Sequence, residues 1–168
     1  MKSSFVSCCL FSVACLISVA YAQELHQNSN SLTKGSAMGA WDAGIFANDV
    51  ALDFLNELDA IDVLPSLAAA VALPNGEYIE EDAGIRALVA AQLIATAKDG
   101  IEDRLPEAAR RIVSRMGRPP SKEMVAAAKI ATLSVLTSSE TKELRSELGS
   151  EEFKKWQNEV KSVLARLN

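Results

Sequence analysis

The residues best suited to binding chemistry gather in one stretch near the start of the second quarter of the 168-residue chain. Trp41 and Phe46 supply aromatic rings, and Asn48 and Asp49 supply polar groups beside them. We take these four, together with Gln92 further along, as candidate binding residues. A structural interpretation is equally open, because a fully buried aromatic ring stabilises a fold by roughly 1.5–3 kcal/mol and the two rings can pack onto the following helix.

Three carboxylates of the same region, Asp42, Asp49 and Asp53, define an alternative. Hard cations bind where several oxygens converge, so this group could support a carboxylate-based or metal-dependent hydrolase. The regular spacing of a calcium loop with its closing Glu is missing, and Asp49 also suits the positive end of a helix dipole. The single histidine, His26, has no neighbour that could complete a catalytic or metal-binding group. We therefore expect a non-catalytic protein with no cofactor and no metal.

Helices are expected to hold these residues in place. Apolar residues recur at three- and four-residue intervals from residue 49 onward, and no alternating strand pattern exceeds a few residues. Asn48 is a typical N-cap, so the first helix is expected to begin at Asp49. Further helices are expected to start near Asp62, Glu80, Pro106, Ser121, either Ser138 or Ser139, and Ser150. The sequence predicts an all-α fold, a compact bundle of about six helices forming one domain over residues 38–168.

Two of these helices carry expectations about their buried faces. The helix after Ser121 is expected to turn inward a broad apolar face of Val125, Ala128, Ile130, Leu133 and Leu136. The last helix, with Ser150 as its N-cap, is expected to pack inside the domain through Phe153, Trp156, Val160, Val163 and Leu167. Their alternating three-and-four spacing is that of a packing seam, and the alternative is that it seats a partner helix.

The helix that starts near Glu80 is expected to be central, because its many alanines let neighbouring helices approach closely. Gln92 is the polar exception in its apolar stripe. A buried amide without partners costs roughly 1–3 kcal/mol. It therefore either ties down a loop by hydrogen bonding to the backbone or serves as a ligand-binding amide in an apolar pocket.

The candidate stretch also belongs to a longer pattern. It opens with Trp41-x-x-Gly44-x-Phe46-x-Asn48-Asp49-x-Ala51-x-Asp53-Phe54. It continues with residues 87–95, Ser139-Glu140, Glu143-Leu144, Trp156 and residues 160–167. This pattern, which covers residues 39–167, resembles the bacterial family known as domain of unknown function 4259. The resemblance implies no activity. Two positions depart from the family pattern, since Gln92 stands where the family tends to have Glu and Arg145 where it tends to have Trp.

Residues 1–22 look like a secretory leader, with a positive charge, an apolar run and a small-residue cleavage site. Residues 23–37 are polar and are expected to form a flexible linker. We therefore expect an exported protein, periplasmic or secreted, with no stable membrane insertion after cleavage. Two alternatives are a lipoprotein anchored through Cys15 and a cytoplasmic protein whose translation starts at Met38.

The formal net charge of −5 limits the partners of the chain. An acidic protein is repelled by nucleic acids and by anionic membrane surfaces, so we expect neither as a partner. A helical domain without reactive groups offers surfaces and grooves more readily than chemistry. The sequence therefore predicts a binding or protein-interaction domain of the bacterial cell envelope, whose partner is another protein.

Overall fold

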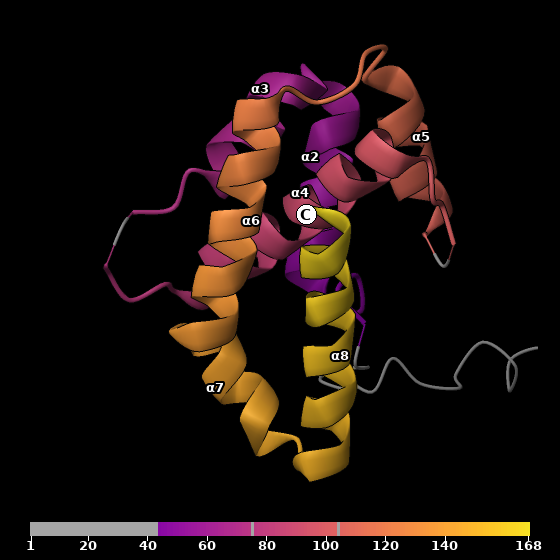
Figure 1. The fold of residues 1–168 in the computed structure, drawn as a ribbon. Coiled ribbons are helices and arrows are strands. Elements are labelled where there is room, and N and C mark those ends of the chain that lie inside the picture. Colours follow the sequence, from indigo (N-terminus) through magenta and orange to yellow (C-terminus); the bar gives the residue numbers. More distant parts are fainter. Residues whose placement is uncertain (1–43, 75, 104) are drawn as a thin grey trace, which may run out of the picture. The chain divides into compact units, whose positions relative to one another are not determined.

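A computed structural model describes residues 44–74, 76–103 and 105–168. The expected leader and linker, and the candidate residues Trp41 and Asp42, lie outside this part of the chain. The described residues form the helices α2 (Asp49–Ala60), α3 (Val63–Val71), α4 (Glu81–Asp99), α5 (Glu107–Arg115), α6 (Lys122–Thr137), α7 (Glu140–Glu147) and α8 (Ser150–Arg166) (Figure 1). Only an isolated bridge between Ile79 and Ser139 is strand-like in them. The all-α prediction is confirmed, with seven described helices in place of about six.

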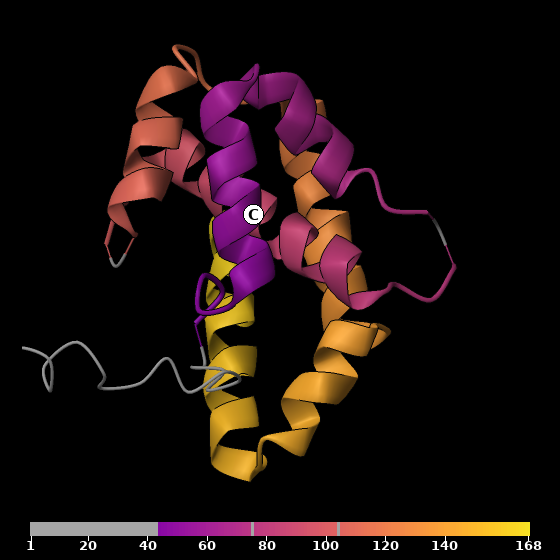
Figure 2. The ribbon, with the colours of Figure 1, turned by 180° about the vertical axis from the view of Figure 1, so that it is seen from behind.

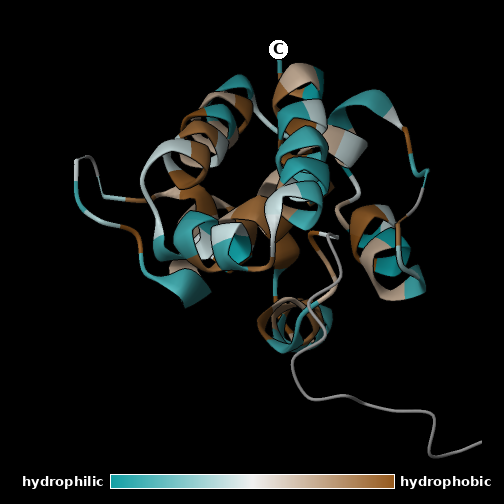
Figure 3. Ribbon diagram, turned by 90° about the horizontal axis from the view of Figure 1, so that it is seen from below, coloured by the Kyte–Doolittle hydropathy of each residue, from teal (hydrophilic) through white to brown (hydrophobic). Residues whose placement is uncertain are grey.

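Helix α4 is the core of the described fold. Within residues 84–96 every residue except Arg86 is buried, and each of the other described helices packs against α4. Figures 1 and 2 show α6 on one side of α4, with α2 and α5 on the other. Figure 3 shows a mainly hydrophobic stretch in the middle, with helices of mixed hydropathy around it. The expected central position is confirmed, although α4 is buried on all sides rather than along one stripe.

Helix α7 approaches α4 closely at the first turns of α4. A Cβ atom on Gly84 would overlap the Oγ1 atom of Thr141 on α7, so only glycine fits there. The Thr141 hydroxyl donates a hydrogen bond to the carbonyl oxygen of Glu81 (3.2 Å). The Glu140 carboxylate accepts one from the backbone N–H of Glu81 (3.0 Å). The start of α7 thereby satisfies backbone groups at the start of α4.

Several helix ends follow the expected capping chemistry. The predicted N-cap Asn48 accepts a backbone hydrogen bond, and so do Ser121 and Ser139, near which helices were expected to begin. Asp62 precedes α3 but its side chain makes no capping bond. The prediction that Ser150 caps the last helix was wrong, because Gly149 is the N-cap and Ser150 is the first helical residue. Gly149 has a φ of 105°, which a side chain rarely adopts.

The buried face of α6 also differs from the prediction. Its buried residues are Ala128, Ala131, Thr132 and Val135. Ile130 and Leu133 are instead 58% and 49% exposed, so the prediction that they face inward was wrong. Helix α6 is apolar on two opposite sides, and periodicity alone does not say which side faces the core. The side with the smaller residues packs against α4, where close approach is possible.

Helix α8 runs back beside α6 and α7 (Figure 1). Trp156, Val160, Val163 and Leu167 are buried, and the Trp156 ring stacks on that of Phe153 with 5.8 Å between the ring centroids. The predicted inward packing of this helix is confirmed.

None of the described helices is long and apolar enough to cross a membrane.

Candidate functional site

The turn that leads into α2, residues 44–48 and here called the hook, belongs to the stretch that the sequence singled out. Ile45 at its centre is buried. The side-chain oxygen of Asn48 accepts a hydrogen bond from the backbone N–H of Ala51 (2.8 Å). Its amide nitrogen donates to the carbonyl oxygen of Ile45 (3.2 Å). Both ends of the Asn48 amide are used by the fold, so this candidate binding residue has a structural role.

The hook is tied to the far end of the chain. The backbone N–H of Ile45 donates a hydrogen bond to Oε1 of Glu159 on α8 (3.1 Å). A hydrogen bond to a charged acceptor is among the stronger ones in proteins. This bond holds the hook against α8 at one border of a cleft.

The cleft has a volume of about 780 Å³ and is here called the α4–α8 cleft. The described residues that line it are Gly44, Phe46, Ala47, Gln92, Asp103, Leu105, Pro106, Lys155, Asn158, Glu159, Ser162 and Arg166. They come from the hook, from α4, from the loop between α4 and α5, and from α8. The volume falls within the roughly 300–1,000 Å³ typical of ligand pockets. Two predicted site residues, Phe46 and Gln92, are brought together here.

Gln92 is the polar group that α4 contributes to the cleft. The residue is 9% exposed, and its side chain makes no hydrogen bond to any residue that the structure describes. Its amide is not fully enclosed, so the small exposed part belongs to the cleft. The expectation that Gln92 ties down a loop finds no support among the described residues. The amide instead keeps one acceptor and two donors for whatever enters the cleft.

One side of α8 forms a polar wall of the cleft. The wall residues are Lys155, Asn158, Glu159, Ser162 and Arg166. Apart from the adjacent pair Asn158 and Glu159, they recur every three or four residues, so they share a side of the helix. That side lies next to the buried stripe that contains Trp156 and Val160. Lys155 is also paired with Glu152 on the same helix (2.5 Å).

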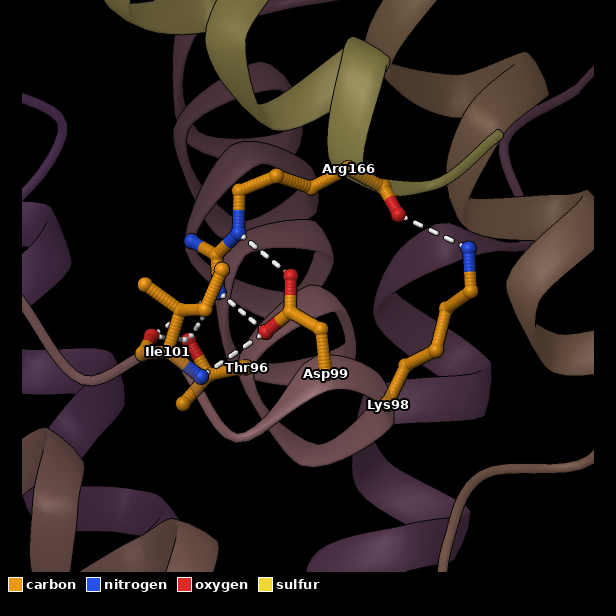
Figure 4. A network of polar contacts seen from close by, with 5 residues as sticks. All are labelled: Thr96, Lys98, Asp99, Ile101 and Arg166. Carbon is orange, nitrogen blue, oxygen red and sulfur yellow. Dashed lines mark hydrogen bonds and ion pairs between the residues drawn. The ribbon is translucent and has the colours of Figure 1, made fainter.

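Arg166 closes the wall at its C-terminal end and clamps α8 to the end of α4 (Figure 4). Its guanidinium donates to both carboxylate oxygens of Asp99 (2.8 Å each), to the hydroxyl of Thr96 (3.1 Å) and to the carbonyl oxygen of Ile101 (2.9 Å). Lys98 donates to the carbonyl oxygen of Arg166 (2.8 Å). The hydrogen bonds from Arg166 lower the pKa of the Asp99 carboxyl, and the Ile101 backbone N–H acts in the same direction.

The carboxylates of the hydrolase alternative lie elsewhere. Asp49 and Asp53 are both exposed on α2, and neither lines the cleft. Asp42 lies outside the described residues, as does Trp41. Within the residues that the structure describes, no group of three His, Cys, Asp or Glu side chains is arranged to hold a metal ion.

Sequence reasoning missed most of the cleft. The residues Lys155, Asn158 and Ser162 look like the solvated face of an amphipathic helix, and nothing local shows that the hook lies opposite them. In the sequence they were marked only by forming a continuous polar stripe beside the apolar stripe of the last helix. Asp103, Leu105 and Pro106 lie in a loop with no distinctive motif.

The described residues thus form an all-helical domain with an open cleft between the central helix α4 and the last helix α8. The family model described as domain of unknown function (DUF4259) matches residues 39–159, so the chain belongs to this family. The match confirms the resemblance found in the sequence. No curated protein and no solved structure matches the chain. The family match includes the hook, Gln92 and Glu159 but ends before Ser162 and Arg166.

Proposed function

We propose that this protein is a non-catalytic binding domain and that the α4–α8 cleft is its ligand site. One observation carries the proposal. Gln92 is nine-tenths buried, lines the cleft and has no hydrogen-bond partner among the described residues. No described residue uses the hydrogen-bonding groups of this amide, and its exposed part is reached from the cleft. A bound ligand would replace the solvent that bonds to it there.

The other polar groups of the cleft support binding rather than chemistry. Glu159 holds the backbone of Ile45, and Arg166 holds Asp99. These two charged groups shape the walls of the cleft. Because Glu159 and Arg166 are held by these partners, the parts of the cleft that they form need little further ordering when a ligand binds.

We further propose that the protein is exported to the periplasm or beyond. The leader-like residues 1–22 support export, and the alternatives are lipidation at Cys15 and translation from Met38. The intact mass of the protein purified from its own bacterium tests this point. Loss of residues 1–22 is the expected result, and a mass that retains them, carries a lipid or begins at Met38 would contradict it.

Thermal unfolding in the presence of chemically distinct probes tests the binding function. The probes are free amino acids, short peptides, monosaccharides, nucleotides, Ca²⁺ and Mg²⁺. A ligand that binds only the folded form must raise the unfolding temperature. We expect at least one organic class to do so with the native protein.

Matched variants assign such a shift to the cleft. Gln92→Met removes the amide at nearly constant volume, and Gln157→Met makes the same change on α8 outside the described lining of the cleft. The shift should vanish in the first variant and persist in the second. No organic probe shifting the native protein, or equal shifts in both variants, would overturn the proposal. A shift with divalent cations alone that is lost in Asp49→Asn or Asp53→Asn would favour the hydrolase alternative.

A further inference from the structure

The polar wall of the α4–α8 cleft is elongated. It extends along α8 from Lys155 to Arg166, and a helix rises 1.5 Å per residue, so the wall is about 16 Å long. An extended peptide rises about 3.3 Å per residue, so about five residues would span this length. A monosaccharide or a single amino acid would cover only part of it.

The amides of the cleft match the chemistry of a peptide backbone. Gln92 on α4 and Asn158 on α8 both line the cleft, and neither side chain makes a hydrogen bond to a described residue. A primary amide presents a donor and an acceptor side by side, and a peptide group offers one acceptor and one donor in return. Two such amides, one from α4 and one from α8, can therefore both pair with the backbone of an extended peptide in the cleft.

The remaining lining indicates which side chains such a peptide would carry. Phe46, Leu105 and Pro106 provide apolar surface from the hook and the loop after α4. The two cations of the wall are already paired, Lys155 with Glu152 and Arg166 with Asp99. Asp103, by contrast, forms no ion pair with a described residue. The cleft therefore favours apolar side chains together with a basic one over an acidic peptide.

We infer that the ligand of the α4–α8 cleft is an extended segment of about five residues of another protein, bound through its backbone by Gln92 and Asn158. This inference rests on the proposed function, since it names the ligand class of the same site. A peptide ligand fits an exported acidic domain whose surface charge repels acidic partners.

The test uses a library of capped pentapeptides randomised at all five positions, passed over the immobilised full-length protein. The native protein and the Gln157→Met variant should retain peptides rich in apolar and basic residues. The Gln92→Met variant should retain about tenfold less, which corresponds to the loss of one well-formed hydrogen bond to the ligand. Equal retention by Gln92→Met and Gln157→Met would overturn the inference, as would retention of no peptide at all. Circular dichroism of both variants verifies that they are folded.

The contribution of the backbone is measured with the most enriched peptide. Calorimetric titration compares this peptide with copies that are N-methylated at one backbone amide at a time, which removes a donor and keeps the side chains. At least one methylated copy should bind about tenfold more weakly. If none does, or if the acetylated and amidated single amino acids bind equally well, the peptide inference fails. The proposed binding function would still stand if small organic probes bind and their binding depends on Gln92. If no probe binds in this way, the proposed function and the peptide inference both fail.

Discussion

The backbone N–H of Ile45 lies 3.1 Å from Oε1 of Glu159, a residue 114 positions further along the chain. This bond joins the hook to α8 and sets one border of the α4–α8 cleft. The cleft is thus a product of the tertiary fold, and its shape depends on a contact between two ends of the described sequence.

Replacing Glu159 by Ala should loosen the hook. The Ile45 N–H would lose its acceptor, so we expect its hydrogen exchange to speed up by about tenfold or more, while amides in the middle of α4 keep their protection. The variant Glu159→Gln retains a side-chain oxygen at the same distance and serves as the control. Exchange by mass spectrometry or NMR measures both. Unchanged exchange at Ile45 in Glu159→Ala would show that the bond does not hold the hook.

The clamp between Asp99 and Arg166 should make stability depend on pH. Arg166 lowers the pKa of the Asp99 carboxyl below its ordinary value of 3.8. A group whose pKa is lowered by folding stabilises the fold above its unfolded pKa and loses this contribution as the pH falls through its folded pKa. The native protein should therefore be more stable than Asp99→Asn at pH 7, by about 1 kcal/mol for this partly exposed pair.

That difference should shrink as the pH falls below about 4, where Asp99 of the unfolded chain takes up its proton, and should be lost once the pH passes the lowered pKa of the folded protein. Urea denaturation of both proteins at pH 7, 4 and 3 measures it. A constant or growing difference toward low pH would contradict the assignment of the lowered pKa to the clamp.

Gly84→Ala should destabilise the protein although alanine is the better helix former. The added Cβ overlaps Oγ1 of Thr141. Overpacking of this kind costs about 1–3 kcal/mol, which exceeds the gain of about 1 kcal/mol in helix propensity. Denaturant unfolding measures the change. Adding Thr141→Ala to the Gly84→Ala variant removes the clashing hydroxyl and should recover part of the lost stability. If the two substitutions instead lower the free energy of unfolding additively, the strain does not come from the contact between residues 84 and 141.

Two substitutions on α6 test which of its apolar sides is buried. Ile130 is 58% exposed and Val135 is fully buried. Ile130→Gln should change the free energy of unfolding by less than about 0.5 kcal/mol. Val135→Ala should cost roughly 2 kcal/mol through lost contacts and a residual cavity. A large loss at Ile130 would mean that this side is covered in the folded protein.

The sequence predicted those features that depend on local chemistry. The start of α2 followed from Asn48, whose side chain caps the helix within three residues. The central position of α4 followed from its many alanines, which let neighbouring helices approach closely. Helix α6 is apolar on two sides, one with Ile130 and the other with Ala131. The side that faces inward depends on how closely α4 approaches, and the periodicity of the sequence carries no information about that distance.

The candidate site was predictable only in part, for a related reason. Gln92 was conspicuous because a polar residue interrupts an apolar stripe, and Phe46 because it is aromatic and near a cap. The wall of α8 was not conspicuous, since residues such as Asn158 and Ser162 are ordinary on a solvated helix face. Their role depends on the hook, which reaches α8 through the long-range contact with Glu159.

The side-chain amide of Gln92 offers the most direct measurement of the central claim. Its two N–H signals can be assigned in a ¹⁵N spectrum by their disappearance in Gln92→Met and followed while the retained pentapeptide is added. These signals should shift in a saturable way and their hydrogens should become protected from exchange, because the ligand becomes their partner. Signals that stay in place while the peptide binds, or that are already protected in the free protein, would contradict the central claim.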